Sequence, residues 1–236
     1  MVVVAPIVRT LIARSLRLVI GRAARVVPRR LRMRYAWRMS RLLQPVIAPA
    51  LRKYRSLRLI NSDRALSLGY VVRAMMDHGC EFDAPVRVHG GELIPTGAAL
   101  FAGGHLYLGI AGLRWLWDRG LPLHLVRMSP DEQCILGTRV PARVIAQDRL
   151  LFIRMRSAFR RGESVAALLD HYETGELAIH PEAFAVALAC GAPVVFMAAE
   201  VSGDEAIDFY LELPKGRDAK EIAQELQQFL LRHAQA

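Results

Sequence analysis

Over residues 1–60, apolar residues and arginines alternate at the spacing of an amphipathic helix. At about 100° per residue, the arginines of residues 6–27 fall, with one exception, within one broad arc, and leucine, isoleucine and valine occupy the opposite arc. The pattern resumes over residues 29–43 and again over residues 50–60, with Pro45 and Pro49 in between. Because proline cannot donate a helical hydrogen bond, the pattern predicts three separate arginine-rich helical pieces.

Beyond residue 60 the pattern changes to short apolar runs that alternate with helical segments. Asn61, Ser62 and Asp63 suit the start of a helix, because such side chains cap helix N-termini. Glycines follow several of the helical segments and are a typical stop signal. The expected helices are 64–76, 108–120, 149–162, 181–191 and 217–234. The expected strands are 86–90, 98–103, 121–128, 143–146, 164–170, 192–201 and 206–213.

This order of elements indicates the fold class. Strands that alternate with helices, and that are apolar without interruption, are typical of a sheet buried on both faces. We therefore expect an α/β fold with a mixed, mostly parallel sheet covered by helices on both faces, preceded by an amphipathic, arginine-rich helical arm. The arm is assigned to residues 1–60 and the α/β domain to residues 61–236.

Charge divides the chain at nearly the same place. Of the 32 lysines and arginines, 15 lie in residues 1–62, which hold no acidic residue, while residues 63–236 carry all 22 acidic residues. A basic arm attached to a mildly acidic body favours a polyanionic surface as the partner. Arginine predominates in the arm, and its guanidinium binds phosphate through two parallel hydrogen bonds.

Three interpretations of the arm are open. Its apolar face can lie in the acyl boundary of an anionic membrane, with Tyr35 and Trp37 at the interface. Alternatively, that face packs on the body and the arginines are solvated. A nucleic-acid backbone is disfavoured, because binding it would not require the apolar surface. We expect residues 1–58 to contact an anionic membrane surface and the protein to be peripheral, at the cytoplasmic face of a membrane, with no nucleic acid as partner.

Cysteine spacing argues against a protein stabilised by disulfides or by a metal, and hydropathy argues against one that spans a membrane. Cys80, Cys134 and Cys190 lie far apart, and no histidine stands at metal-ligand spacing from them, so we expect neither a disulfide framework nor a metal site. No run approaches the roughly 18 apolar residues that span a bilayer.

Candidate chemistry begins at the end of the apolar run 98–103. Gly103 and Gly104 end this run, His105 follows, and a helical segment begins at Leu108. Ligands of open α/β sheets bind at the carboxyl ends of strands. The glycines let the backbone approach a ligand and adopt positive φ, the imidazole suits a general base for a hydroxyl, and the helix N-terminus favours developing negative charge.

Three blocks within residues 86–213 carry a resemblance to a known family. The first block has a buried strand that ends in histidine and reads VRVHGGELIPTGAALFAGGHLYLGIAGLRWLWDRGLPLHLV. The second block has an arginine-bearing helix and a strand that ends in aspartate, and it reads RLLFIRMRSAFRRGESVAALLD. The third block has a helix that ends in Gly-Ala-Pro and reads EAFAVALACGAPVVFMA. In order and spacing these blocks resemble the lysophospholipid acyltransferase superfamily, most closely the late acyltransferases of lipid A biosynthesis. The resemblance covers a little over half of the chain.

The resemblance implies transfer of a fatty acyl group from a thioester, on acyl carrier protein or coenzyme A, to a hydroxyl of a lysolipid or glycolipid at a membrane. It implies no metal and no redox cofactor. His105 falls on the histidine of the family's H-x4-[D/E] motif, whose carboxylate orients the imidazole. Gly103 and Gly104 then lie near the reacting carbonyl, and Leu106 and Leu108 beside the acyl chain.

The acidic position of that motif holds Ile110 in this chain. Isoleucine neither accepts the second imidazole proton nor stabilises the imidazolium. Three interpretations follow. Asp170, at a neighbouring strand end, or Glu182 supplies the carboxylate; a backbone carbonyl orients the ring; or the protein is a catalytically degenerate relative that binds lipid or a protein partner.

Further binding residues are expected on either side of Asp170. Only the segment HYETGELAIHP separates Asp170 from the next helix, so His180 is the local candidate for acceptor recognition. Arg156 and Arg160 precede a strand and are candidates for binding an acceptor phosphate or the phosphopantetheine arm of the donor.

Overall fold

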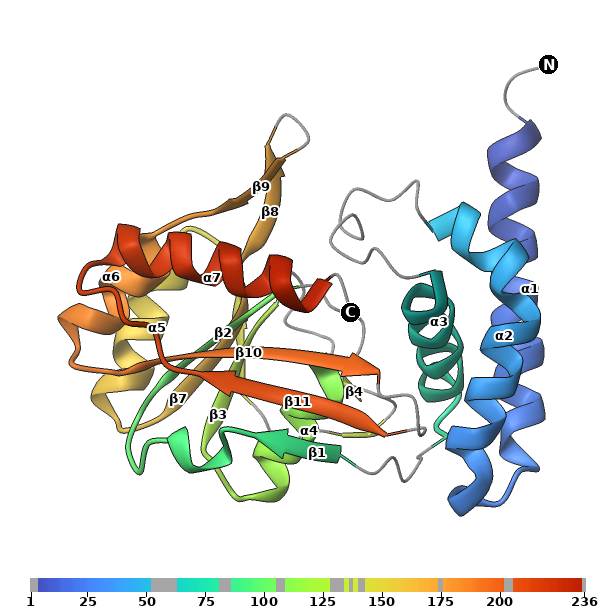
Figure 1. The fold of residues 1–236 in the computed structure, drawn as a ribbon, viewed down its shortest axis with the longest axis horizontal. Helices are drawn as coiled ribbons and strands as arrows, with labels where there is room; N and C mark the ends of the chain where they lie inside the picture. The colour runs from blue at the N-terminus through green and yellow to red at the C-terminus, as the bar shows by residue number, and fades with distance from the viewer. Residues whose placement is uncertain are drawn as a thin grey trace.

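A computed structural model of the chain shows an arginine-rich helical arm at one end of the molecule and an α/β body at the other (Figure 1). The structure describes residues 4–51, 63–80, 86–104, 109–127, 134–135, 138–139, 143–173, 176–201 and 206–234. The helices are α1 (Val4–Arg25), α2 (Arg32–Leu51), α3 (Asp63–Asp77), α4 (Gly109–Asp118), α5 (Leu151–Arg160), α6 (Glu182–Ala189) and α7 (Ala219–Ala234), with 3-10 turns η1 (Arg29–Leu31) and η3 (Gly91–Leu93). The strands are β1 (Val86–His89), β2 (Leu100–Gly103), β3 (Leu123–Arg127), β4 (Cys134–Ile135), β5 (Thr138–Arg139), β6 (Arg143–Ala146), β7 (Ser164–Leu168), β8 (Asp170–Glu173), β9 (Glu176–Ile179), β10 (Val194–Val201) and β11 (Ile207–Glu212).

A seven-stranded sheet in the order β1-β11-β10-β2-β7-β3-β6 forms the centre of the body. β11 runs antiparallel to β10, and every other neighbouring pair in this sheet is parallel. The prediction of a mixed, mostly parallel sheet is therefore confirmed. Two short hairpins, β4–β5 and β8–β9, stand outside it.

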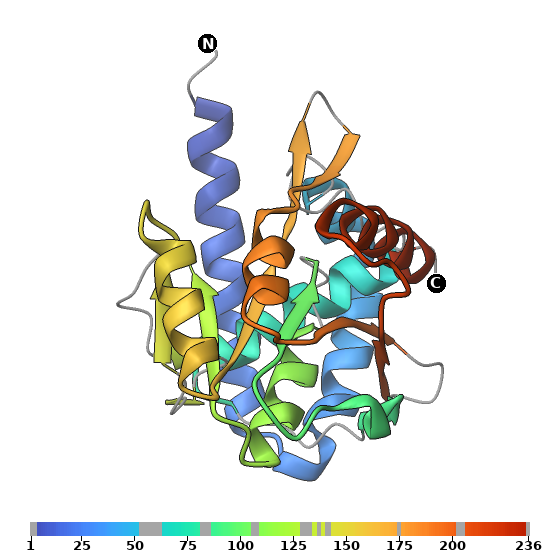
Figure 2. The same cartoon turned by 90° about the vertical axis from the view of Figure 1, so that its left-hand side faces the viewer.

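Helices cover both faces of the sheet, as predicted. Phe209 of β11 contacts Trp115 of α4, while its neighbour Tyr210 contacts His233 of α7. Because successive side chains of a strand point to opposite faces, α4 and α7 lie on opposite sides. α5 and α7 both pack against α6, on the α7 side (Figure 2). The inner strands β2 and β7 are buried along nearly their whole length, as expected where both faces are covered, whereas β1 and β11 alternate buried and more exposed residues.

The arm is a unit of three helices in which α3 packs against both α1 and α2. Ile20 of α1, Trp37 of α2 and Met75 of α3 are buried, so the inward apolar side chains of α1 and α2 pack against α3. The burial of Trp37 contradicts the expectation that this side chain lies at a membrane interface. The guanidinium of Arg64 lies 4.2 Å from the centre of the Trp37 ring. The expected boundary between the arm and the α/β domain at residue 60 stays a prediction. α3 follows this boundary in the chain and packs against α1 and α2.

The prediction that Pro45 and Pro49 break the second helix is wrong, because α2 runs through both prolines to Leu51. Each proline removes one helical hydrogen bond. Ile47, Ala48 and Leu51 are nevertheless buried, and packing of such side chains contributes about 1.5–3 kcal/mol for each large one, which offsets the loss. The third expected helical piece, beyond Leu51, lies outside the described residues.

The segment after Asp170 also differs from expectation, because a hairpin stands where a loop was expected. β7 ends at Leu168, and Asp170 opens β8, where it pairs with Ile179 of β9. Gln227 of α7 donates a hydrogen bond of 2.7 Å to the carbonyl of Leu177, so a helix from the end of the chain supports the hairpin. The other expected elements of the body are present with small shifts of their ends, and glycines with positive φ follow α4, α5 and α6.

Candidate active site

The carboxyl ends of β2 and β7 meet at the Gly103–Gly104 turn. Gly103 is paired with Leu168 in the parallel ladder, and the backbone N–H of Leu169 donates a hydrogen bond of 2.9 Å to the Gly103 carbonyl. Both strands belong to the continuous apolar layer, so packing fixes where they end. The turn therefore lies at the edge of the sheet where ligands of this fold class bind.

Both glycines of the turn are closely packed, Gly103 against backbone and Gly104 against a side chain. A methyl group on Gly103 would lie 2.8 Å from the backbone oxygen of Met197, and one on Gly104 would lie 3.0 Å from both Cδ atoms of Leu230. Neither glycine has positive φ, which corrects the expectation that they are needed for that conformation. Instead, β10 and α7 approach the turn closely at these two positions.

Asp170 lies beside this turn. Its side chain is buried, with 7% of the residue exposed, and its Cγ would lie 3.5 Å from a methyl group on Gly104. Asp170 opens β8 directly after the end of β7, and the hydrogen bond at Leu169 holds this segment against β2. The structure thus brings one of the two expected carboxylates to the residue that precedes His105.

Glu182 and His180 are placed differently from Asp170. Glu182 is exposed in the first turn of α6. His180 is also exposed and stacks on His171 across the hairpin, with ring centres 3.9 Å apart. Because Asp170 pairs with Ile179 and strand side chains alternate, the two histidines occupy the face of the hairpin opposite to Asp170.

Arg156 and Arg160 lie exposed on α5. α5 ends at Arg160, shortly before β7 begins at Ser164, so Arg160 lies at the amino edge of the sheet. The structure does not bring Arg160 together with the Gly103–Gly104 turn, which lies at the carboxyl edge. The expectation had rested on sequence order alone, which does not tell the two edges apart.

The remaining expected site residues are not described. His105, Leu106 and Leu108 lie outside the described residues, and for Ile110 only its position in the first turn of α4 is described. The helix expected after the turn is present from Gly109.

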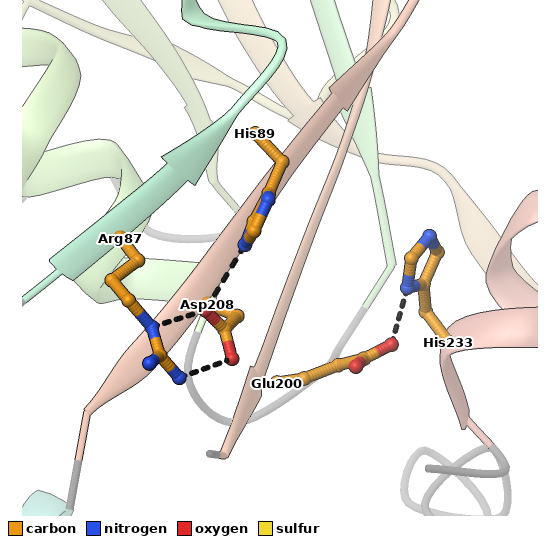
Figure 3. Close-up of polar contacts among 5 residues, drawn as sticks. All are labelled: Arg87, His89, Glu200, Asp208 and His233. Atoms are coloured by element: carbon orange, nitrogen blue, oxygen red, sulfur yellow. Dashed lines mark hydrogen bonds and ion pairs between the residues drawn. The ribbon is translucent and has the colours of Figure 1, made fainter. Parts of the chain in front are cut away.

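α7 supplies contacts to the site that the sequence did not indicate. Leu230 is fully buried against Gly104, and three residues later His233 forms a hydrogen-bonded pair with Glu200 of β10 (Figure 3). The ring of Tyr210 lies 4.5 Å from the ring of His233 and 4.5 Å from that of His89. The sequence predicted a helix over residues 217–234, but only the crossing of α7 over β10 and β2 shows which strands this helix meets.

Beside this pair, Asp208 joins β11 to the edge strand β1 (Figure 3). Its carboxylate accepts hydrogen bonds of 2.9 and 3.1 Å from Nε and Nη2 of Arg87 and lies 3.0 Å from Nε2 of His89. The hydrogen bond from Arg87, above all, holds the pKa of Asp208 below its usual value. Burial, followed by the charge of Glu200, raises the pKa of Tyr210.

No cluster suited to a metal ion occurs within the described ranges. Cys80 and Cys190 are free thiols. None of the helices that the structure describes is long and apolar enough to cross a membrane.

Comparisons with known proteins give a partial likeness among solved structures. No protein-family model matches the chain, and no curated protein matches it. Among solved structures, the chain is similar to the crystal structure of the 1-acyl-sn-glycerophosphate (LPA) acyltransferase PlsC from Thermotoga maritima, with 11% identity and a TM-score of 0.46 over 88% of this chain and 98% of that chain. At this level the likeness carries no inference about activity.

Proposed function

We propose that the protein is a membrane-associated acyltransferase that transfers a fatty acyl group from an acyl thioester to a lipid hydroxyl. The observation that carries the proposal is the buried carboxyl group of Asp170 beside Gly104, the residue that immediately precedes His105. This carboxyl group stands at the carboxyl edge of the sheet, and the acidic position of the family signature holds Ile110 in this chain.

In the proposed reaction, His105 takes the proton of the acceptor hydroxyl as the oxygen attacks the thioester carbonyl. Backbone N–H groups at the turn stabilise the negative charge on the carbonyl oxygen of the tetrahedral intermediate. The C–S bond then breaks, and the thiolate leaves and receives the proton. Asp170 stabilises the imidazolium between these steps. Leu106 and Leu108 contact the acyl chain, and the reaction as proposed uses no metal or redox cofactor.

The arm is the proposed membrane contact. Large apolar side chains remain exposed on α1 and α2, and directly after α1: Leu18, Val19, Leu42 and Val46 on the helices, and Val26 after α1. Exposed arginines of the same helices stand among them: Arg22, Arg25, Arg34, Arg38 and Arg41. Apolar and cationic side chains on one surface suit an anionic lipid surface. We place the protein there as a peripheral protein, on the cytoplasmic face.

The test of catalysis is transfer of a labelled acyl group. The purified full chain is assayed with acyl carrier protein and coenzyme A thioesters against a panel of lysolipid and glycolipid acceptors. We expect turnover by the wild type and a loss on the order of 10²–10⁴-fold in His105→Ala, as for removal of a general base. His180→Gln, on the hairpin face opposite to Asp170, is the matched histidine control for the base. Equal turnover by wild type and His105→Ala would exclude the proposed mechanism.

A degenerate relative that binds lipid without turning it over is the second candidate function, and Ile110 is the observation that favours it. The variant Ile110→Glu restores the acid of the family signature. If only this variant turns over, the wild-type site is degenerate. If the wild type already turns over, an acid elsewhere in the chain or a backbone carbonyl orients the His105 ring.

The membrane proposal is tested by flotation with vesicles. We expect the full chain to float with phosphatidylglycerol vesicles and not with phosphatidylcholine vesicles. The variant Leu42→Glu/Val46→Glu removes exposed apolar side chains of α2 and should stay unbound. Salt-sensitive binding to duplex DNA, without flotation, would identify the arm as a nucleic-acid contact instead.

A further inference from the structure

A second cationic surface lies on α5, away from the arm. Residues 143–162 hold six arginines and only one acidic residue, Asp148, although residues 63–236 as a whole carry more acidic than basic residues. The arginines of this segment therefore form a local concentration of positive charge.

Four side chains of α5 recur at helical spacing and are all exposed. This α5 stripe consists of Phe152, Ile153, Arg156 and Arg160. Phe152 is 39% and Ile153 65% exposed, while the opposite side of the helix is buried against β6 and β7. Exposed large apolar side chains bordered by arginine are typical of protein interfaces, where arginine and aromatic residues are enriched.

The nearby acids neutralise other arginines. Asp148 forms an ion pair of 3.1 Å with Arg154, and Glu163 one of 2.6 Å with Arg161. Arg156 and Arg160 make no ion pair within the part of the chain that the structure describes. The stripe therefore keeps its positive charge available for a partner.

The stripe and the arm lie at opposite ends of the molecule. α1 and α2 form one end of the longest axis, and α5 and α6 the other (Figure 1). In the perpendicular view α5 and α6 face the viewer, with the arm behind the sheet (Figure 2). A flat membrane that contacts the outer sides of α1 and α2 cannot also reach α5. With the arm on the membrane, as proposed above, the stripe faces a soluble partner.

The stripe begins at the edge of the sheet that carries the candidate site. β6 is parallel to β3, and β3 to β7, so all three end at the same edge as β2. α5 follows β6 and so starts at this edge, with Phe152 in its first turn. A partner on α5 would sit beside the carboxyl edge.

We propose that the α5 stripe docks an acidic carrier protein that presents the acyl group as a thioester. The carrier's role as donor rests on the proposed acyl transfer. Phe152 and Ile153 would form the apolar centre of the contact, and the arginines would attract the carrier's acidic residues and speed its association. A free coenzyme A thioester offers no apolar protein surface to cover the two apolar residues.

The test measures docking directly. The full chain is titrated with acyl carrier protein loaded with a saturated acyl chain, and separately with the coenzyme A thioester of the same chain. The variant Arg156→Glu/Arg160→Glu should raise the Kd for the carrier at least about tenfold, leave binding of the coenzyme A thioester unchanged, and still float with phosphatidylglycerol vesicles. The matched control Arg38→Glu/Arg41→Glu makes the same charge change on the arm and should keep carrier binding while losing flotation.

Three outcomes overturn the proposal. These are carrier binding by the α5 variant equal to that of the wild type, no carrier binding by the wild type, and loss of flotation in the α5 variant, which would identify the stripe as a lipid contact. The Kd is measured without turnover, so docking and acyl transfer are tested separately. If carrier binding depends on the stripe but the protein transfers no acyl group, the proposed function is wrong and the docking site stands.

Discussion

The carboxyl group of Asp170 lies beside Gly104, although Gly104 follows β2 and Asp170 opens β8, with α4, β3, β4, β5, β6, α5 and β7 between them in the chain. β2 and β7 are parallel neighbours, so both end at the carboxyl edge of the sheet. The hydrogen bond from the Leu169 N–H to the Gly103 carbonyl holds Leu169, and with it the start of Asp170, at this edge. A methyl group at Gly104 would be in ordinary van der Waals contact with Cγ of Asp170, at 3.5 Å, so the carboxyl group lies directly beside this position.

Asp170→Asn tests whether this carboxylate serves the proposed reaction. The amide keeps the size of the side chain and removes its charge, so the imidazolium would lose its stabilising partner. We expect kcat to fall at least about 10²-fold, with a smaller change in KM, measured by steady-state acyl transfer. Glu182→Gln is the matched control, because Glu182 is exposed on α6 and should tolerate the same change. Unchanged kcat in Asp170→Asn would contradict the role given to Asp170.

The two glycines of the turn should respond differently to alanine. The added methyl would meet a backbone oxygen at 2.8 Å in Gly103→Ala, but the ends of the Leu230 side chain at 3.0 Å in Gly104→Ala. A leucine side chain moves more easily than a strand. We expect Gly103→Ala to lower the free energy of unfolding by about 1–3 kcal/mol and Gly104→Ala by less, as measured by urea denaturation. The reverse order would show that close packing does not select these glycines.

Pro45 offers a test of the arm. α2 continues through this position, where proline leaves one carbonyl of the preceding turn without its helical donor. Pro45→Ala restores that donor, so we expect the free energy of unfolding to rise, by up to about 3 kcal/mol. The change is followed by circular dichroism during urea denaturation. A decrease would mean that the packing of α2 on α3 depends on the shape that the proline gives the helix.

Glu163 should make stability depend on pH. Hydrogen bonds from Arg161, and then from the buried His124, lower the pKa of this carboxyl below its ordinary value of 4.5. Its contribution to stability is therefore present above about pH 4.5 and is lost as the pH falls through the lower pKa of the folded state. We expect Glu163→Gln to be less stable than wild type at pH 7, by about 1 kcal/mol.

The measurement for Glu163 is the midpoint of urea denaturation from pH 7 to pH 3. The difference in stability between Glu163→Gln and wild type should shrink toward pH 3. Protonation of Glu163 in wild type removes there the interactions of the carboxylate that the variant lacks at every pH. Asp148→Asn is the control, since Asp148 is nearly half exposed in its ion pair with Arg154. A constant difference over the whole range would contradict this account.

The sequence by itself determined most of the elements of the body. Uninterrupted apolar runs such as 98–103 predicted strands buried on both faces, and the glycine after each of α4, α5 and α6 predicted where that helix ends. These signals are local, because strand burial and helix termination depend on residues a few positions apart. The sequence also singled out Asp170 as a carboxylate at a strand end, since β7 could be placed from its own pattern.

Only the tertiary structure decided which of these residues meet. The alternation of residues 170–179 was too short and mixed to predict the β8–β9 hairpin, whose support comes from Gln227 of α7. Pro45 indicated a break that packing on α3 overrides. Arg160 and the Gly103–Gly104 turn both lie near strand ends, but at opposite edges of the sheet. Contacts between distant segments follow from strand order and helix crossing, which no local periodicity contains, and this is why Asp170 and Gly104 came together only in the fold.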